Sequence, residues 1–153
     1  MNIDNFRITF VTEMMHQPIF DYLRTKKALG YIAMVKEWTR NGVGAIAINC
    51  SSKVTRHSVE EVEKTMIEAV NLLGTQFEQM SDDQFERSKM SYVKFLNKPH
   101  KSLKRLFMTN DKELIYRRYK FDRRKQEAEK LPEISKKDFI KFYKGQFYKK
   151  NEN

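Results

Sequence analysis

The feature that most constrains this fold is a single pair of strand-like runs in a chain whose pattern is otherwise helical. Residues 31–38 and 43–50 are rich in branched and aromatic side chains, and Asn41-Gly42 between them is typical of a tight turn. The sequence therefore predicts an antiparallel hairpin. Because a lone two-stranded hairpin is marginally stable and leaves both edges unpaired, we expect further strands, supplied by another chain or by residues beyond this sequence.

Helical periodicity dominates the rest of the chain. Apolar residues predict a helix from Ile3 to Met14, and Pro18 is placed to open a second helix that Gly30 ends. Ser58 and Ser81 each precede a Glu or Gln by three residues, which is the pattern of a capping box. No repeat or low-complexity linker divides the chain, so one α+β domain over residues 1–153 is expected. Further helices are expected over residues 59–77, 81–98, 102–119, 123–130 and 135–142.

Composition and charge limit the partners without naming one. The chain carries 30 Lys and Arg against 20 Asp and Glu, a net charge of +10 that attracts anions. Nucleic acid, nucleotide, anionic lipid, polyphosphate, acidic peptide and a merely solvated basic face all stay open. The single cysteine, Cys50, excludes an internal disulfide and a thiolate-rich zinc site. No stretch reads as a membrane span or signal peptide, so a cytoplasmic location without membrane attachment is expected.

No catalytic centre emerges from the residue pattern. His57-Ser58-Val59-Glu60-Glu61 has Glu where an inverted His-x-x-Glu-His zinc site requires its second histidine, so His57 is expected simply to precede a helix. His16 and His100 have no neighbours at ligand spacing. Cys50 lacks an evident base and is expected to be a small apolar residue near a strand end. We therefore expect no catalytic residue and no metal ligand in this chain.

Arg24 and Tyr31 flank a predicted helix-to-strand turn that can aim both side chains at one cleft. A guanidinium can fork onto a peptide carbonyl or carboxylate, and a phenol can donate to a carbonyl oxygen that gains negative charge. This pair suits peptide binding and oxyanion support. The alternative is structural, since an arginine near a helix C-terminus favours the helix dipole and a strand tyrosine often packs.

The segment Leu23-Arg24-Thr25-Lys26-Lys27-Ala28-Leu29-Gly30-Tyr31 is similar to one in the C-terminal half of insulin-degrading-enzyme-like members of the pitrilysin-like zinc metallopeptidases. The likeness covers about Asn5 to Tyr148, and continues through Asn97-Lys98-Pro99 and Lys137 to Lys144. It implies the fourth of four α+β domains that enclose a chamber. It further implies that Arg24 and Tyr31 hold the substrate backbone beside a zinc bound by the N-terminal half. Strands that open and close the family domain do not occur here, which implies an incomplete domain.

The resemblance also implies a basic chamber wall that attracts polyanions, although Ala47 and Phe95 depart from the family's basic pattern. The residues concerned are Lys94, Lys98, His100, Lys101 and Lys104. The expected function is therefore a non-catalytic, substrate-binding domain whose partners are peptides and the N-terminal catalytic half of the same or another chain. Two alternatives stay open. One is a stand-alone inactive paralogue that regulates a complete peptidase. The other is a basic nucleic-acid-binding module, suggested by the cations and aromatics of residues 116–125, although no RNP, KH or zinc-finger pattern supports it.

Overall fold

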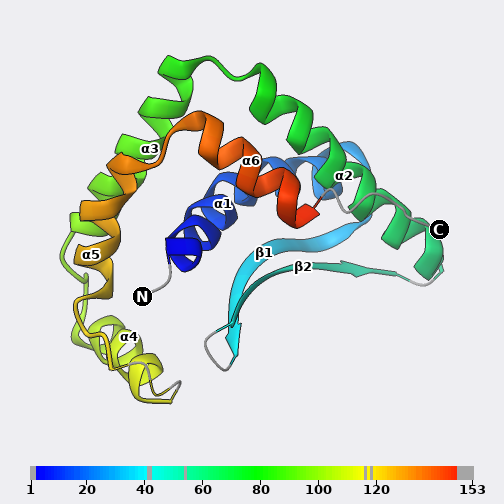
Figure 1. Ribbon diagram of the computed structural model, residues 1–153. Coiled ribbons are helices and arrows are strands. Elements are labelled where there is room, and N and C mark those ends of the chain that lie inside the picture. The colour runs from blue at the N-terminus through cyan, green and yellow to red at the C-terminus, as the bar shows by residue number, and fades with distance from the viewer. Residues whose placement is uncertain (1–2, 41–42, 54, 116, 118, 148–153) are drawn as a thin grey trace.

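The computed structural model describes residues 3–40, 43–53, 55–115, 117 and 119–147. Helices gather around one long hairpin, so the fold is α+β, as the sequence predicts (Figure 1). The elements are α1 (Ile3–Phe20), the π-helical segment η1 (Asp21–Lys26), β1 (Gly30–Arg40), β2 (Val43–Ser52), α2 (Val59–Gln79), α3 (Asp82–Asn97), α4 (Leu103–Ile115), α5 (Arg123–Lys130), the 3-10 turn η2 (Leu131–Glu133) and α6 (Lys136–Phe147).

The hairpin confirms the predicted strand pair; β1 extends beyond the predicted range at both ends, and β2 extends two residues beyond its predicted end. β1 and β2 pair antiparallel, with Ala33 opposite Cys50 and Val35 opposite Ile48. Within the described residues the sheet holds only these two strands. The predicted Asn41-Gly42 turn lies outside the described residues.

Helix α1 lies against the hairpin, and α2 and α6 pack beside it, so that aromatic side chains from several helices meet in one core (Figure 1). The ring of Phe10 on α1 lies 5.9 Å from that of Phe85 on α3 and 5.4 Å from that of Phe139 on α6. Tyr143, also buried, donates a 2.7 Å hydrogen bond to the carbonyl of Val70. α3 pairs with α5 at the far side of this core. Among the described helices, none combines the length and apolar character needed to cross a bilayer.

The predicted capping boxes are confirmed. Ser58 accepts a bond from the Glu61 amide, and the Glu61 carboxylate accepts one from the Ser58 amide at 2.9 Å. Ser81 and Gln84 form the same reciprocal pair at the start of α3. These caps satisfy amides that an α-helix leaves without partners, which fixes where α2 and α3 begin.

The predicted break at Pro18 is wrong. α1 continues through Pro18 to Phe20, and the backbone then widens into η1, where the Lys27 amide bonds to the carbonyl of Tyr22, five residues earlier. The proline removes one helical donor, yet the packed α1 face keeps the helix intact across it.

The prediction that Gly30 ends this helix is also wrong. Ala28 makes the reversal, with a left-handed φ of 48°, and the Leu29 amide closes the end on the Leu23 carbonyl. Gly30 instead opens β1 at an irregularity in the strand pairing. A Cβ at Gly30 would lie 1.7 Å from the Ser51 carbonyl oxygen, so the close approach of the strands is what requires glycine.

Candidate functional site

The structure brings Arg24 and Tyr31 together. The Arg24 guanidinium carbon lies 4.8 Å from the ring centre of Tyr31 and 4.9 Å from that of Phe20. The guanidinium is therefore stacked between two aromatic rings from different elements, α1 and β1. Such cation–π contacts hold an arginine in place while its in-plane N–H groups stay free to donate.

Buried neighbours fix this stack, which we call the Arg24–Tyr31 platform. Leu23 and Leu29 lie in the core on either side of the turn, joined by the bond between their backbones. At the surface, Lys27 forms a 3.2 Å ion pair with Glu68 of α2. The backbone that carries Arg24 and Tyr31 is therefore anchored from inside and outside.

Both polar groups of the platform are available to a ligand. Tyr31 is 84% exposed and Arg24 is partly exposed. Apart from the ring contacts, neither side chain bonds to another residue in the part of the chain that the structure describes. A forked cationic donor and a phenolic donor thus stand side by side, which is an arrangement suited to backbone carbonyls and carboxylates.

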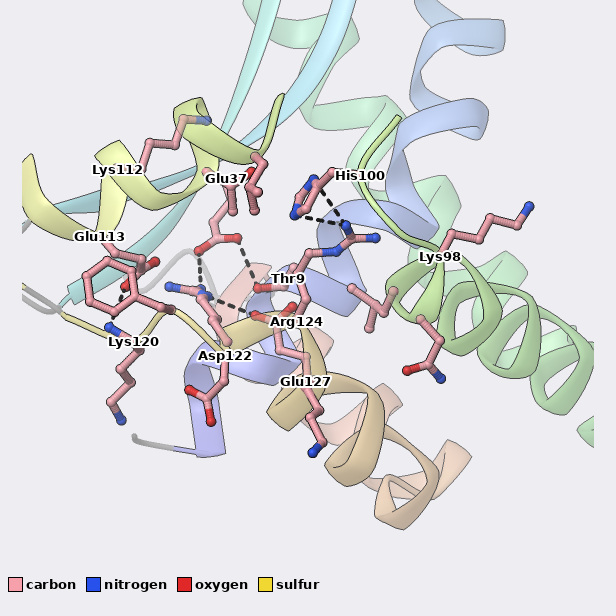
Figure 2. A pocket seen from close by; sticks show the side chains of 17 residues that line it. Thr9, Glu37, Lys98, His100, Lys112, Glu113, Lys120, Asp122, Arg124 and Glu127 are labelled. Atoms are coloured by element: carbon pink, nitrogen blue, oxygen red, sulfur yellow. Dashed lines mark hydrogen bonds and ion pairs between the residues drawn. The ribbon is translucent and has the colours of Figure 1, made fainter. Parts of the chain in front are cut away.

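A second candidate region is a cavity of about 670 Å³ between α4, α5 and the hairpin, whose lining side chains Figure 2 shows. His100 and Arg124 meet at its edge, with an Arg124 Nη1 to His100 Nε2 distance of 3.3 Å. Arg124 also donates a 2.7 Å bond to the Phe95 carbonyl. Lys98 and Lys112 add further cations to the lining.

The floor of this cavity is a charge network that is satisfied within the chain. Arg123 contacts Glu37 of β1 at 3.0 Å and Glu127 at 2.9 Å. Thr9 donates a hydrogen bond to Glu37 (Figure 2). Burial disfavours the charged guanidinium, but the two facing carboxylates outweigh it and raise the pKa of Arg123. Arg123 therefore stabilises the fold through these ion pairs. The positive charge that could bind a ligand lies at the rim of the cavity.

The predicted basic residues divide between several positions. Lys98 and His100 line this cavity, and Lys101 lines an adjoining one of about 560 Å³. Lys94 and Lys104 are exposed and line neither cavity. The walls hold further cations that the sequence pattern does not assign to this region, among them Arg105, Lys112 and Arg124. Arg124 belongs to the basic run at residues 123–125, but only the fold places that run beside His100.

Two other sequence expectations concern reactive groups. His57 precedes the N-cap Ser58, as expected, and Glu61 is engaged in the capping box. Cys50 lies in β2 against the core, where burial raises the pKa of its thiol and so lowers its thiolate fraction. No group of three or more His, Cys, Asp or Glu side chains suited to a metal ion occurs among the described residues.

The basic stretch behind the nucleic-acid alternative is only partly described. Tyr116 and Arg118 lie outside the described residues. Arg123 is engaged by carboxylates, and Arg124 by His100 and a backbone carbonyl. Part of the charge in this stretch is therefore used inside the fold.

Comparison with known proteins gives one consistent family. Residues 10–110 match the family model described as PQQ synthase PqqF-like, C-terminal lobe domain 4. The chain is 34% identical over 144 residues to the insulin-degrading enzyme of Drosophila melanogaster, covering 92% of this chain and 14% of that protein. It is 27% identical over 131 residues to the nardilysin of Rattus norvegicus, covering 86% of this chain and 11% of that protein.

The fold of this chain is similar to that of a solved pitrilysin structure. A crystal structure of pitrilysin matches 88% of this chain and 14% of its own, with a TM-score of 0.71 at 12% identity. The chain thus spans about 14% or less of the length of these relatives. It belongs to the PqqF-like C-terminal lobe domain 4 family, within the pitrilysin- and insulysin-like metallopeptidases.

Proposed function

We propose that this chain is a non-catalytic, peptide-binding domain of an insulin-degrading-enzyme-like zinc metalloendopeptidase that degrades peptides in a closed chamber. The observation that carries the proposal is the Arg24–Tyr31 platform, where two free donors stand together on an open surface. In this proposal the zinc, its ligands and the general base come from the N-terminal catalytic half of the same or another chain.

The chemistry of the platform supports a positioning role. Arg24 would donate its forked N–H pair to carbonyl or carboxylate oxygens of an extended peptide. Tyr31 would donate its hydroxyl to a neighbouring carbonyl, and the bond would strengthen if that carbonyl gained negative charge during attack. Because stacking already restricts Arg24, binding would cost less side-chain entropy than for a free arginine.

The test is made in the assembled peptidase that contains this sequence. Tyr31→Phe removes one hydroxyl, and Arg24→Lys keeps the charge but loses the fork. We expect each to lower kcat/KM for an unstructured peptide by roughly tenfold or more, with zinc content unchanged. Tyr119→Phe is the matched control, because Tyr119 is also exposed but lies after α4. Normal kinetics in both platform variants would sink the assignment.

The unfinished sheet supports the proposal that this chain is an incomplete domain of a longer assembly. β2 (Val43–Ser52) carries no charged residue and no proline, so its outer edge lacks the devices that protect natural edge strands. β1 carries Lys36 and Glu37 and an irregularity at Gly30, which is typical of an exposed edge. We therefore expect the additional strands beside β2. The outward amides of β2 should exchange rapidly in the chain alone and slowly in the assembled enzyme.

Anion binding at the rim of the larger cavity is a second candidate function. It is favoured by the clustering of Lys98, His100, Lys112 and Arg124 above acids that are already paired. Inorganic tripolyphosphate is the probe, measured by calorimetry at two salt concentrations. We expect salt-sensitive binding that a Lys98→Gln, Lys112→Gln variant loses and a Lys64→Gln control keeps. Submicromolar RNA binding at physiological salt would instead revive the nucleic-acid reading.

A further inference from the structure

The smaller cavity, of about 560 Å³, lies between α3, α4 and the start of α5, beside the larger one. Part of its lining is apolar. Phe95 of α3 is 54% exposed and Met108 of α4 is 51% exposed, although both line a concave surface. Large apolar side chains that meet solvent in a cavity of this size are typical of a small-molecule site.

The smaller cavity differs from the larger one in its charge. In the larger cavity the cations stand among acids, which include Glu37, Glu113 and Asp122. The described lining of the smaller cavity holds several basic side chains but a single acid, Glu127, which already pairs with Arg123 at 2.9 Å. A ligand in the smaller cavity therefore meets a positive potential that attracts an anion.

Lys101 and Arg105 are the cations most available in this cavity. Both are exposed, and both line the smaller cavity but not the larger one. Neither side chain bonds to another residue in the ranges that the structure describes. Arg124, by contrast, contacts His100 and donates to the Phe95 carbonyl (Figure 2). An ammonium group and a forked guanidinium thus remain to donate to a bound carboxylate.

The apolar lining favours a flexible chain over a flat ring. The rings of Tyr92 and Phe95 pack on each other, with centres 5.9 Å apart. The rest of the apolar lining is aliphatic and consists of Leu96, Pro99 and Met108. A flat ligand is held best between two rings, and the described lining offers only this one stacked pair. Met108 has an unbranched side chain, which adapts to a flexible partner.

We propose that the smaller cavity binds an aliphatic carboxylate, whose chain lies along Phe95 and Met108 and whose carboxylate accepts hydrogen bonds from Lys101 and Arg105. An inorganic anion would leave the apolar lining in water, and a neutral chain would leave the cations unpaired. The inference depends neither on the peptide-binding role nor on anion binding in the larger cavity, because Lys101, Arg105 and Met108 do not line that cavity.

The experiment is nuclear magnetic resonance of the 153-residue chain with labelled methionine methyl groups, titrated with octanoate below the concentration at which micelles form. We expect the Met108 signal to shift saturably. The signal of Met90, which is 45% exposed on α3 and lines neither cavity, should stay in place. Hexanoate should bind roughly tenfold more weakly, because it buries two fewer methylene groups. The neutral 1-octanol should also bind roughly tenfold more weakly, because it lacks the charge.

Two variants test the two halves of the site, with binding followed on the octanoate signals. Met108→Gln and Arg105→Gln should each raise the dissociation constant by roughly tenfold. Their matched controls on α3, Met90→Gln and Arg87→Gln, should leave it unchanged. Circular dichroism confirms that each variant is folded. No shift at millimolar octanoate, octanol that binds as tightly as octanoate, or binding that survives both variants would overturn the proposal.

Discussion

Gly30→Ala should damage both the hairpin and the platform that it supports. The new methyl group would lie 1.7 Å from the Ser51 carbonyl oxygen, and contacts under 3.0 Å essentially never occur at a Cβ. The strands must therefore part by about 1 Å or more at this end, which strains the packing and breaks local backbone bonds. Strain of about 1–3 kcal/mol and bonds worth about 1 kcal/mol each give a loss of about 2–4 kcal/mol.

The chain contains its own control for this substitution. Gly145 lies within α6, and a Cβ there would meet nothing within 4 Å. Gly145→Ala should therefore stabilise the chain by about 0.5–1 kcal/mol, through the lower conformational entropy of the unfolded state. The same chemical change thus has opposite signs at the two positions.

Equilibrium urea unfolding, followed by far-UV circular dichroism, measures both free energies of unfolding. Gly30→Ala should also weaken peptide binding, because Tyr31 is its immediate neighbour. A Gly30→Ala variant within about 0.5 kcal/mol of the wild type, or as stable as Gly145→Ala, would show that the close approach of the strands at Ser51 does not require glycine.

Three other predictions concern stability. Ala28→Gly should stabilise the chain by about 1 kcal/mol in urea unfolding, because φ of 48° strains a side chain; a clear loss would contradict this. Lys89→Met should cost about 2–3 kcal/mol in the same assay, since buried Lys89 donates to the carbonyls of Pro132 and Ile134, and an unchanged midpoint would argue against this role. Burial, aided by nearby carboxylates, raises the pKa of Tyr92 above its ordinary 10.0. Above pH 10 the unfolded chain therefore loses a proton that the folded chain keeps, so the wild type should lose stability relative to Tyr92→Phe between pH 9 and pH 11, and parallel pH profiles would exclude the effect.

Local patterns in the sequence predicted most of the elements. Ser58 and Ser81 predicted the starts of α2 and α3 correctly, because a capping box involves only neighbouring residues. The turn after α1 was misread for the opposite reason. Whether Pro18 breaks a helix, and whether Ala28 or Gly30 makes the reversal, depends on packing against the hairpin. Tertiary contacts therefore overruled local preference there.

The candidate sites also divide into features set by neighbouring residues and features set by tertiary contacts. Arg24 and Tyr31 could be selected from sequence because they flank one turn, but Phe20, the second ring of the stack, could not. The cavity beside His100 is made by segments far apart in the sequence, so Lys112 and Arg124 were not assigned to it.

We propose that Arg24 and Tyr31 jointly hold a peptide. Nuclear magnetic resonance tests it most directly, by titrating the labelled chain with an unstructured peptide and following the Arg24 Nε–H and Tyr31 ring signals. Both signals should shift with one dissociation constant, while the signal of Arg87, an exposed residue of α3, should stay unchanged. Peptide binding that leaves both signals in place, or that shifts only the basic residues around His100, would contradict it.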